Sequence, residues 1–139
     1  EFVRRPEAFD LVVASNLFGD ILSDMAAIIT GSIGLAASGN INPDGEQPSM
    51  FEPVHGSAPD IAGQGIANPY SMIGSVAMML EMSFGMDDEA RNLWQAMQSV
   101  FADGYSTPDL ARRGDAEHII TTAAFGDKVV SKLATLPTP

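Results

Sequence analysis

FEPVHGSAPDIAGQGIANP, residues 51–69, is the stretch of this sequence that decides both the fold and the chemistry. An apolar run predicts a strand over 50–54, and turn-forming residues from His55 to Asp60 end it. Small residues let a ligand approach the backbone, and the amides of a Gly-Ser-Ala loop can donate to phosphate oxygens. Asp60 has the acidic side chain that accepts two hydrogen bonds from a ribose diol in NAD-specific sites. The structural alternative is a long polar loop in which His55 is an ordinary loop histidine.

The same stretch lacks the fingerprint of a Rossmann dinucleotide site. Gly63-Gln64-Gly65 is followed by Asn68, and the third glycine of that fingerprint is absent. The sequence contains no phosphate-binding P-loop, no HExxH metalloprotease motif and no GxSxG nucleophile elbow. With His55 and His118 as its only histidines and no cysteine, the chain has too few parts for a zinc site.

Residues 16–24, NLFGDILSD, contain a second candidate site. The pattern predicts a helix from Asn16 to about Thr30, on which Asp20 and Asp24 lie one turn apart on the same face. Two like charges in that position lower helix stability unless something neutralises them. Mg²⁺ or Mn²⁺ is held by one or two protein carboxylates together with substrate oxygens. The structural alternative is a solvated helix face, which the spacing alone favours.

Outward from these two stretches, strand-like and helix-like segments alternate, a pattern typical of the α/β class. Leu11–Ala14 predicts a strand buried on both faces, and the run 31–37 predicts a second strand entered through a flexible joint. Prolines, a glycine and acids predict a surface loop over 40–49. Apolar spacing predicts helices over Pro69–Phe84, Asp87–Gly104 and Asp115–Leu133. The residues expected in the core are Met72, Ile73, Val76, Met79 and Leu80 of the first of these helices, Leu93, Met97, Val100 and Phe101 of the second, and Ile119, Ile120, Ala123 and Val130 of the last.

The charge distribution excludes several classes of partner. The 139 residues carry a net charge of −11, and no Lys or Arg occurs between Pro6 and Ala90, where 12 Asp and Glu lie. Such a charge repels nucleic acid and anionic lipid, and no apolar run reaches the roughly 20 residues that cross a bilayer. The lack of cysteine fits a reducing cytoplasm. We therefore expect a cytoplasmic protein without nucleic-acid or membrane partners, whose acidic stretch needs a metal ion or basic groups from elsewhere.

Taken together, NLFGDILSD, the Gly-Ser-Ile-Gly run at 31–34 and FEPVHGSAPDIAGQGIANP resemble the β-decarboxylating dehydrogenases, the family of isocitrate, 3-isopropylmalate, homoisocitrate, tartrate and D-malate dehydrogenases. The motifs come in the family's order and cover essentially the whole chain. The resemblance implies an α/β fold of the isocitrate/isopropylmalate dehydrogenase type, with this chain as the C-terminal fragment of a two-domain, homodimeric enzyme. Residues 1–30 are expected to end the inserted, dimer-forming domain, and residues 31–139 to form the C-terminal part of the cofactor-binding domain.

The resemblance also implies roles for individual residues. Asp20 and Asp24 match the family's two helix aspartates, which bind Mg²⁺ or Mn²⁺. NADP-dependent relatives have lysine and tyrosine at the positions of Asp60 and Ile61, and a carboxylate there repels a 2′-phosphate, so we expect NAD. After Leu110, Ala111-Arg112-Arg113-Gly114 departs from the family's glycine pair. The expected NAD-binding residues are Glu52 near the nicotinamide ribose and, around the adenosine half, His55, Gly56, Ser57, Ala58, Pro59, Asp60, Ile61, Asn68 and Asp109.

The implied reaction is the oxidation of a 2-hydroxy acid by hydride transfer to NAD, with loss of CO₂. The family's catalytic lysine and tyrosine, its substrate-binding arginines and a third metal-binding aspartate belong to sequence before Glu1, so no catalytic residue is assigned in this chain. The run 42–50, with its second proline, resembles tartrate and D-malate dehydrogenases, and one of these acids is the expected substrate. The alternatives are 3-isopropylmalate as substrate, or a non-catalytic fragment that serves only in folding or dimer formation.

Overall fold

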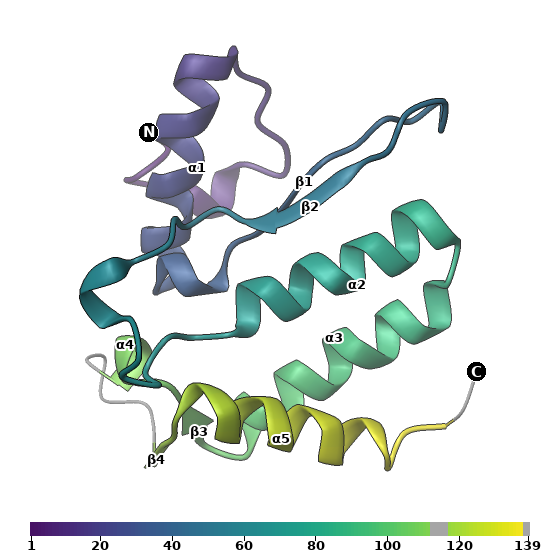
Figure 1. Cartoon of the computed structure of the whole chain (residues 1–139). Coiled ribbons are helices and arrows are strands. Elements are labelled where there is room, and N and C mark those ends of the chain that lie inside the picture. The colour runs from purple at the N-terminus through teal and green to yellow at the C-terminus, as the bar shows by residue number, and fades with distance from the viewer. Residues whose placement is uncertain (112–116, 138–139) are drawn as a thin grey trace.

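The computed structural model describes residues 1–111 and 117–137 of the chain, and it mixes helices with short strands (Figure 1). No helix in these ranges is long and apolar enough to cross a membrane. The helices are α1 (Asn16–Thr30), α2 (Tyr70–Phe84), α3 (Asp87–Ala102), α4 (Pro108–Ala111) and α5 (Thr122–Leu133). The strands are β1 (Ala37–Asn40), β2 (Met50–Pro53), β3 (Tyr105–Ser106) and β4 (His118–Ile119).

Helices α2, α3 and α5 form the main packed body of the chain (Figure 1). Gly85 separates α2 from α3 because it adopts a left-handed conformation, with φ of 64°, and donates its N–H to Glu81 O. Acidic residues Asp87 and Asp88 open α3, where their charge suits the positive end of the helix dipole. The two predicted helices and the stop between them are confirmed.

The core lies between α3 and α5. Its buried members are Ala96, Met97, Val100, Phe125 and Val129. The rings of Phe101 and Phe125 lie 5.3 Å apart, and those of Tyr70 and Phe101 lie 5.2 Å apart. Because burial disfavours the ionised phenol, it raises the pKa of Tyr70 above its ordinary value of 10.0. This ring therefore packs against the core as part of its rim.

The β1–β2 hairpin packs on α2 through small side chains. The strands are antiparallel, with Ala37 opposite Pro53 and Asn40 opposite Met50. The run 31–37 was predicted as a strand, but Ile33–Leu35 forms a 3-10 helix, because the Ser32 hydroxyl accepts from Gly34 N, and β1 begins only at Ala37. The fully or nearly fully buried residues of α2 are Ser71, Gly74, Ser75 and Ala77.

The predicted apolar core face of α2 is partly wrong. Met72 is 50% exposed and Val76 is 38% exposed, whereas Ile73, Met79 and Leu80 are half-buried. The reason is close packing: a Cβ on Gly74 would lie 2.7 Å from the Trp94 ring, so the neighbouring elements approach α2 on its small-residue side. Residue size, and not hydrophobicity, therefore selects the inward face of this helix.

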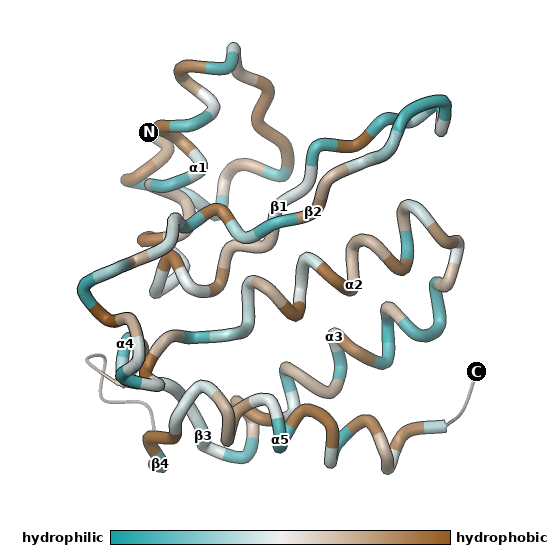
Figure 2. The backbone as a smooth tube through the Cα atoms, in the orientation of Figure 1, coloured by the Kyte–Doolittle hydropathy of each residue, from teal (hydrophilic) through white to brown (hydrophobic). Residues whose placement is uncertain are grey.

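The N-terminal 30 residues lie apart from the body formed by α2, α3 and α5 (Figure 1). The prediction of a buried strand over Leu11–Ala14 is wrong: the segment has no strand, and Leu11 and Val13 are 83% and 88% exposed. A strand needs a neighbour for its backbone groups, and no strand in the described chain lies beside this segment. Figure 2 shows brown, apolar colouring on this segment and on α1.

The last helix is shorter than predicted. It begins at Thr122, with the Thr121 hydroxyl accepting from Ala124 N, while Asp115 and the residue after it lie outside the described residues. Ile119, expected in this helix, belongs to β4 and pairs in parallel with Ser106. Ile119 and Val130 are 59% and 66% exposed, and Ala123 is also exposed, so the predicted inward positions of these three residues are wrong. Phe125 and Val129 take the core positions instead.

Candidate functional site

A cleft of about 890 Å³ lies where three distant segments of the chain meet. The end of α1 and the turn after it form one wall, the loop from His55 to Asn68 forms another, and Pro108 and Asp109 at the start of α4 form the third. Within residues 1–111 and 117–137, Asp109 is the only carboxylate on these walls, and no Lys or Arg lines them. The cleft therefore presents backbone amides, small side chains and apolar surface.

Most of the predicted cofactor-binding residues line this cleft. Those in its wall are His55, Gly56, Ser57, Ala58, Ile61, Asn68 and Asp109. Glu52, Pro59 and Asp60 are not in the wall. Glu52 lies opposite Ser38 in the β1–β2 hairpin and is exposed. Asp60 is exposed as well.

The turn after Ala58 explains why Ile61 faces the cleft while Asp60 does not. Ala58 adopts a left-handed conformation with φ of 44°, and its carbonyl accepts from Ile61 N at 3.1 Å. Pro59 opens the 3-10 helix Pro59–Ile61, and the Gln64 amide donates to Asp60 O at 2.8 Å. With this tight turn, Ile61 lines the cleft, whereas Asp60 lies outside the cleft wall and is exposed.

Asn68 and Asp109 form a hydrogen-bonded bracket across the cleft floor, although 41 residues separate them. The Asn68 amide donates to Asp109 Oδ2 at 3.1 Å, and its carbonyl oxygen accepts from Tyr70 N at 3.0 Å. The Thr107 hydroxyl donates to the other carboxylate oxygen, Asp109 Oδ1. Gly34 fits against the bracket, where a Cβ would come within 2.7 Å of Asn68 Cβ. The loop, α2 and α4 are thus fixed to one another at this point.

His55 has partners on both ring nitrogens. Nδ1 lies 3.0 Å from Gly56 O, and Nε2 lies 3.0 Å from Ser71 Oγ. Ser71 is fully buried in the first turn of α2, so the histidine connects the loop that forms this cleft wall to the buried side of the helix.

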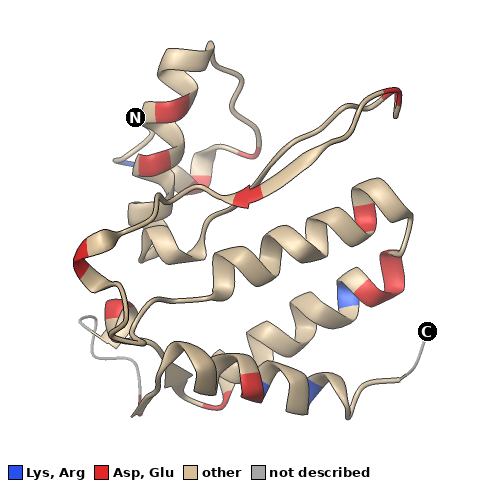
Figure 3. Ribbon diagram, viewed as in Figure 1, with Lys and Arg blue, Asp and Glu red and all other residues tan. Residues whose placement is uncertain are grey.

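The predicted metal-binding pair lies on α1. Asp20 and Asp24 are both exposed, and Figure 3 shows the two red bands one turn apart on this helix. Two carboxylate groups fit the demand of Mg²⁺ or Mn²⁺ for one or two protein carboxylates. Among the described residues, no group of three or more His, Cys, Asp and Glu side chains is close enough to hold a metal ion. Asp20 and Asp24 therefore bring two carboxylates to one face of α1, and no third such ligand lies near them in the described part of the chain.

Four residues of the cleft and its support received no site role from the sequence. Ser32 and Gly34 line the cleft. The Thr107 hydroxyl donates to the Asp109 carboxylate, and the Ser71 hydroxyl forms a hydrogen bond with His55 Nε2. The signal for the first two was the run of small residues at 31–34, which periodicity assigned to a strand. Ser71 has no comparable signal, because only the fold brings it to His55, 16 residues earlier.

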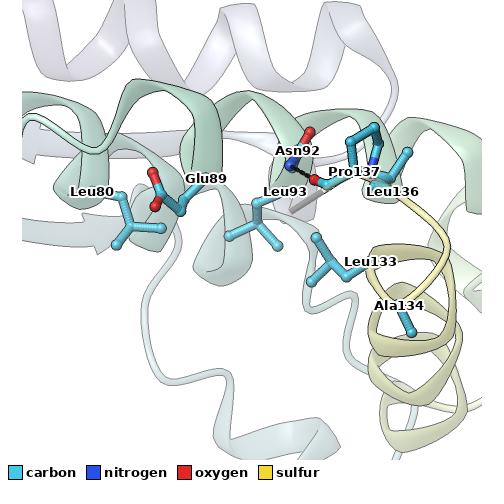
Figure 4. Close-up of a pocket in the computed structure, with 8 residues that line it drawn as sticks. All are labelled: Leu80, Glu89, Asn92, Leu93, Leu133, Ala134, Leu136 and Pro137. Atoms are coloured by element: carbon cyan, nitrogen blue, oxygen red, sulfur yellow. Dashed lines mark hydrogen bonds between the residues drawn. The ribbon is translucent and has the colours of Figure 1, made fainter. Parts of the chain in front are cut away.

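A second, smaller pocket of about 400 Å³ lies at the other end of the body, between the end of α2, the start of α3 and the turn after α5 (Figure 4). Its walls come mainly from leucines, and the Asn92 amide donates to Pro137 O at 3.0 Å across one side. It contains none of the predicted site residues. We therefore take the larger cleft as the candidate functional site.

Comparison with known proteins agrees with the geometry. Residues 1–129 match the family described as isocitrate/isopropylmalate dehydrogenase. A solved structure titled isocitrate dehydrogenase, from Methylococcus capsulatus, superimposes with a TM-score of 0.85 and 46% identity, covering 95% of this chain and 37% of that one. A β-decarboxylating dehydrogenase from Thermococcus kodakarensis gives a TM-score of 0.77 and 39% identity over 96% of this chain and 36% of that one.

Similar sequences carry two different substrate names. A probable tartrate dehydrogenase/decarboxylase of Bacillus subtilis is 51% identical over 97% of this chain. A 3-isopropylmalate dehydrogenase of Halalkalibacterium halodurans is 48% identical over 96% of it. The chain spans about 36% of the length of each of these relatives, as expected for a portion of a larger enzyme. The fold and family predicted from the motifs are confirmed, and this chain belongs to the isocitrate/isopropylmalate dehydrogenase family.

Proposed function

We propose that this chain is the C-terminal part of an NAD- and divalent-metal-dependent enzyme that oxidises and decarboxylates a 2-hydroxy acid such as tartrate or D-malate. The observation that carries the proposal is the cleft, in which the loop of His55 to Ile61 meets Asn68 and Asp109. Those are the residues that the family resemblance assigns to the cofactor. The complete protein that contains this chain is called the complete enzyme below.

The cleft supplies the contacts that an adenosine group needs. Ile61, Ile33 and Ile66 give apolar wall against which a planar base packs, and Gly56, Ser57 and Ala58 allow the backbone to approach the ligand. Asn68 is already held by Asp109 and Tyr70 N, so it meets the adenine edge as a fixed group. Because the bracket is preformed, little conformational entropy is lost there on binding.

Asp60 supports NAD rather than NADP. It lies exposed next to the cleft, one residue before the lining residue Ile61, so its carboxylate can accept from the two hydroxyls of the ribose. A 2′-phosphate in the same place would meet this carboxylate with no Lys or Arg anywhere between Pro6 and Ala90 to compensate. Figure 3 shows the same absence of blue along the hairpin and α2.

Asp20 and Asp24 would hold Mg²⁺ or Mn²⁺ together with ligands from outside this chain. When bound, the metal acidifies the substrate hydroxyl and stabilises the negative charge that develops on loss of CO₂. The contribution of α1 is to present two carboxylates one turn apart on a helix whose own sequence contains no lysine or arginine. The groups that move protons are expected before Glu1.

Dimer formation is the proposed role of the exposed face of α1. Its large apolar residues remain 38–67% exposed, which is unusual for a helix in a water-soluble body. The exposed members are Leu17, Phe18, Ile21, Met25 and Ile28. Coverage by a second copy of the enzyme fits the predicted homodimer, and the predicted boundary between residues 30 and 31 coincides with the end of α1 at Gly31.

3-Isopropylmalate is the second candidate substrate, because relatives with that name reach 52% identity over 132 residues, the same level as the tartrate enzyme. The run 42–50, which favours tartrate or D-malate, lies in the loop between β1 and β2 and lines neither pocket. The preference for tartrate or D-malate therefore rests on the resemblance of this run and not on a contact with either pocket.

The test is NADH production by the complete enzyme with NAD, Mn²⁺ and each of D-malate, tartrate and 3-isopropylmalate, beside a blank without enzyme. We expect turnover of D-malate or tartrate above 3-isopropylmalate, and none from this chain alone, because its acid-base groups are missing. A preference for 3-isopropylmalate would change the proposed substrate but leave the proposed reaction, oxidation with decarboxylation, unchanged. Turnover by the isolated chain, or no NADH with any of the three acids, would contradict the proposal.

A further inference from the structure

The hydrogen bonds of His55 determine which of its ring nitrogens carries the proton. Gly56 O, 3.0 Å from Nδ1, is a carbonyl oxygen and can only accept, so Nδ1 carries the hydrogen. In the neutral ring Nε2 is then an acceptor, and the Ser71 hydroxyl, 3.0 Å away, must donate to it. The two contacts together select one tautomer and one ring orientation.

Ser71 is itself held firmly. It is completely buried, and its carbonyl accepts from the Ser75 hydroxyl at 2.9 Å. Ser75 Oγ in turn accepts from Ser38 N of β1 at 3.3 Å. Hydrogen bonds through Ser75 therefore link the hairpin to the backbone of Ser71, the residue whose hydroxyl contacts the ring of His55.

We propose that Ser71 is a positioning residue for the cofactor: it holds the neutral His55 ring in the Nδ1–H form, with the ring in the cleft wall. Both ring nitrogens are then occupied by protein partners, so His55 meets the adenosine group with its ring surface and not with a nitrogen. The part of this inference that concerns NAD rests on the proposed function, whereas the position of the proton on a neutral ring follows from the two contacts.

The experiment uses the complete enzyme with Ser71→Ala, with Ser71→Thr, which keeps the hydroxyl, and with Ser83→Ala as a matched control on the exposed part of the same helix. Selective ¹⁵N labelling of histidine reports the tautomer of His55, assigned with a His55→Gln variant. Steady-state kinetics with varied NAD report KM and kcat separately. Ser71→Cys, nearly the volume of serine but a weak donor, takes the place of the alanine variant if that variant does not fold.

We expect an Nδ1-protonated neutral ring in the wild type, in Ser71→Thr and in Ser83→Ala, and a mixture of tautomers in Ser71→Ala. Loss of one hydrogen bond should raise KM for NAD about threefold to tenfold, with kcat within about twofold. An unchanged tautomer in Ser71→Ala and Ser71→Cys would overturn the inference. A changed tautomer with unchanged KM would confirm the hydrogen bond but overturn the role of His55 in cofactor binding, and with it the assignment of this cleft.

Discussion

Replacing Gly34 with alanine introduces a methyl group at a close contact in the cleft wall. The new Cβ would lie 2.7 Å from Asn68 Cβ and 3.3 Å from Asp109 Oδ2. Ordinary van der Waals contact begins at about 3.4 Å. Asn68 must therefore retreat by about 0.7 Å, and it is buried, so the space for that movement is small.

The movement of Asn68 affects two hydrogen bonds. The Asn68 amide is 3.1 Å from Asp109 Oδ2, and its oxygen is 3.0 Å from Tyr70 N, so a shift of this size takes at least one of them beyond hydrogen-bonding distance. Overpacking a filled site costs about 1–3 kcal/mol, and a lost hydrogen bond to a charged group about 1.5–3 kcal/mol. Because the contacts are shared, we expect a combined loss of about 2 kcal/mol.

The assay is calorimetric titration of the complete enzyme with NAD, together with its thermal unfolding midpoint. If the bracket supports the adenosine site, Gly34→Ala should weaken NAD binding about tenfold or more, since 1.4 kcal/mol corresponds to a factor of ten. The matched control is Gly126→Ala in α5, where an added Cβ meets nothing within 4 Å. This control should stabilise α5 by about 0.5–1 kcal/mol and leave NAD affinity unchanged.

Equal NAD affinity in Gly34→Ala and Gly126→Ala would refute the reasoning, because it would mean that the Asn68–Asp109 bracket does not support the cofactor. A lower midpoint with unchanged affinity would give the same answer, and would assign the bracket to stability alone.

Three further predictions concern the metal, the cofactor and pH. In the complete enzyme, Asp20→Asn should weaken Mn²⁺ binding and turnover more than Asp24→Asn, measured by Mn²⁺ titration; wild-type turnover in Asp20→Asn would contradict the metal assignment. Asp60→Lys with Ile61→Tyr should lower the NAD/NADP ratio of kcat/KM by removing repulsion and adding donors, and an unchanged ratio would argue against this loop. Burial raises the pKa of Tyr70, so the folded state keeps a proton that the unfolded chain loses, and stability should fall as pH rises above the ordinary value of 10.0. Tyr70→Phe should flatten that fall in urea unfolding series from pH 9 to 11, and an equal slope in both proteins would contradict it.

Local signals predicted the helices that local chemistry determines. Gly31 ends α1 and Gly85 ends α2, and both glycines have positive φ, as helix stops require. The β2 strand was also predicted, because the turn residues after it are unambiguous. The cleft wall from His55 to Asn68 followed from the motif, and no periodicity contains that information.

Predictions that depended on a burial partner failed. Leu11–Ala14 has a strand's composition but no neighbouring strand in the described chain, and Met72 has a core residue's hydropathy but faces away from the small-residue side of α2. The apolar spacing of Ile119 suits a helix, yet the residue pairs with Ser106 in β4. In each case the outcome depended on whether a tertiary contact is present, and a short window of sequence does not contain that information.

Hydrogen–deuterium exchange of the complete enzyme, with and without saturating NAD, tests the central claim most directly. The account predicts slower amide exchange in peptides from 31–34 and 55–68, which line the large cleft, and unchanged exchange at 133–137, which lines the smaller pocket. Protection at 133–137, or none at 55–68 under conditions where NAD binding is independently measured, would contradict it.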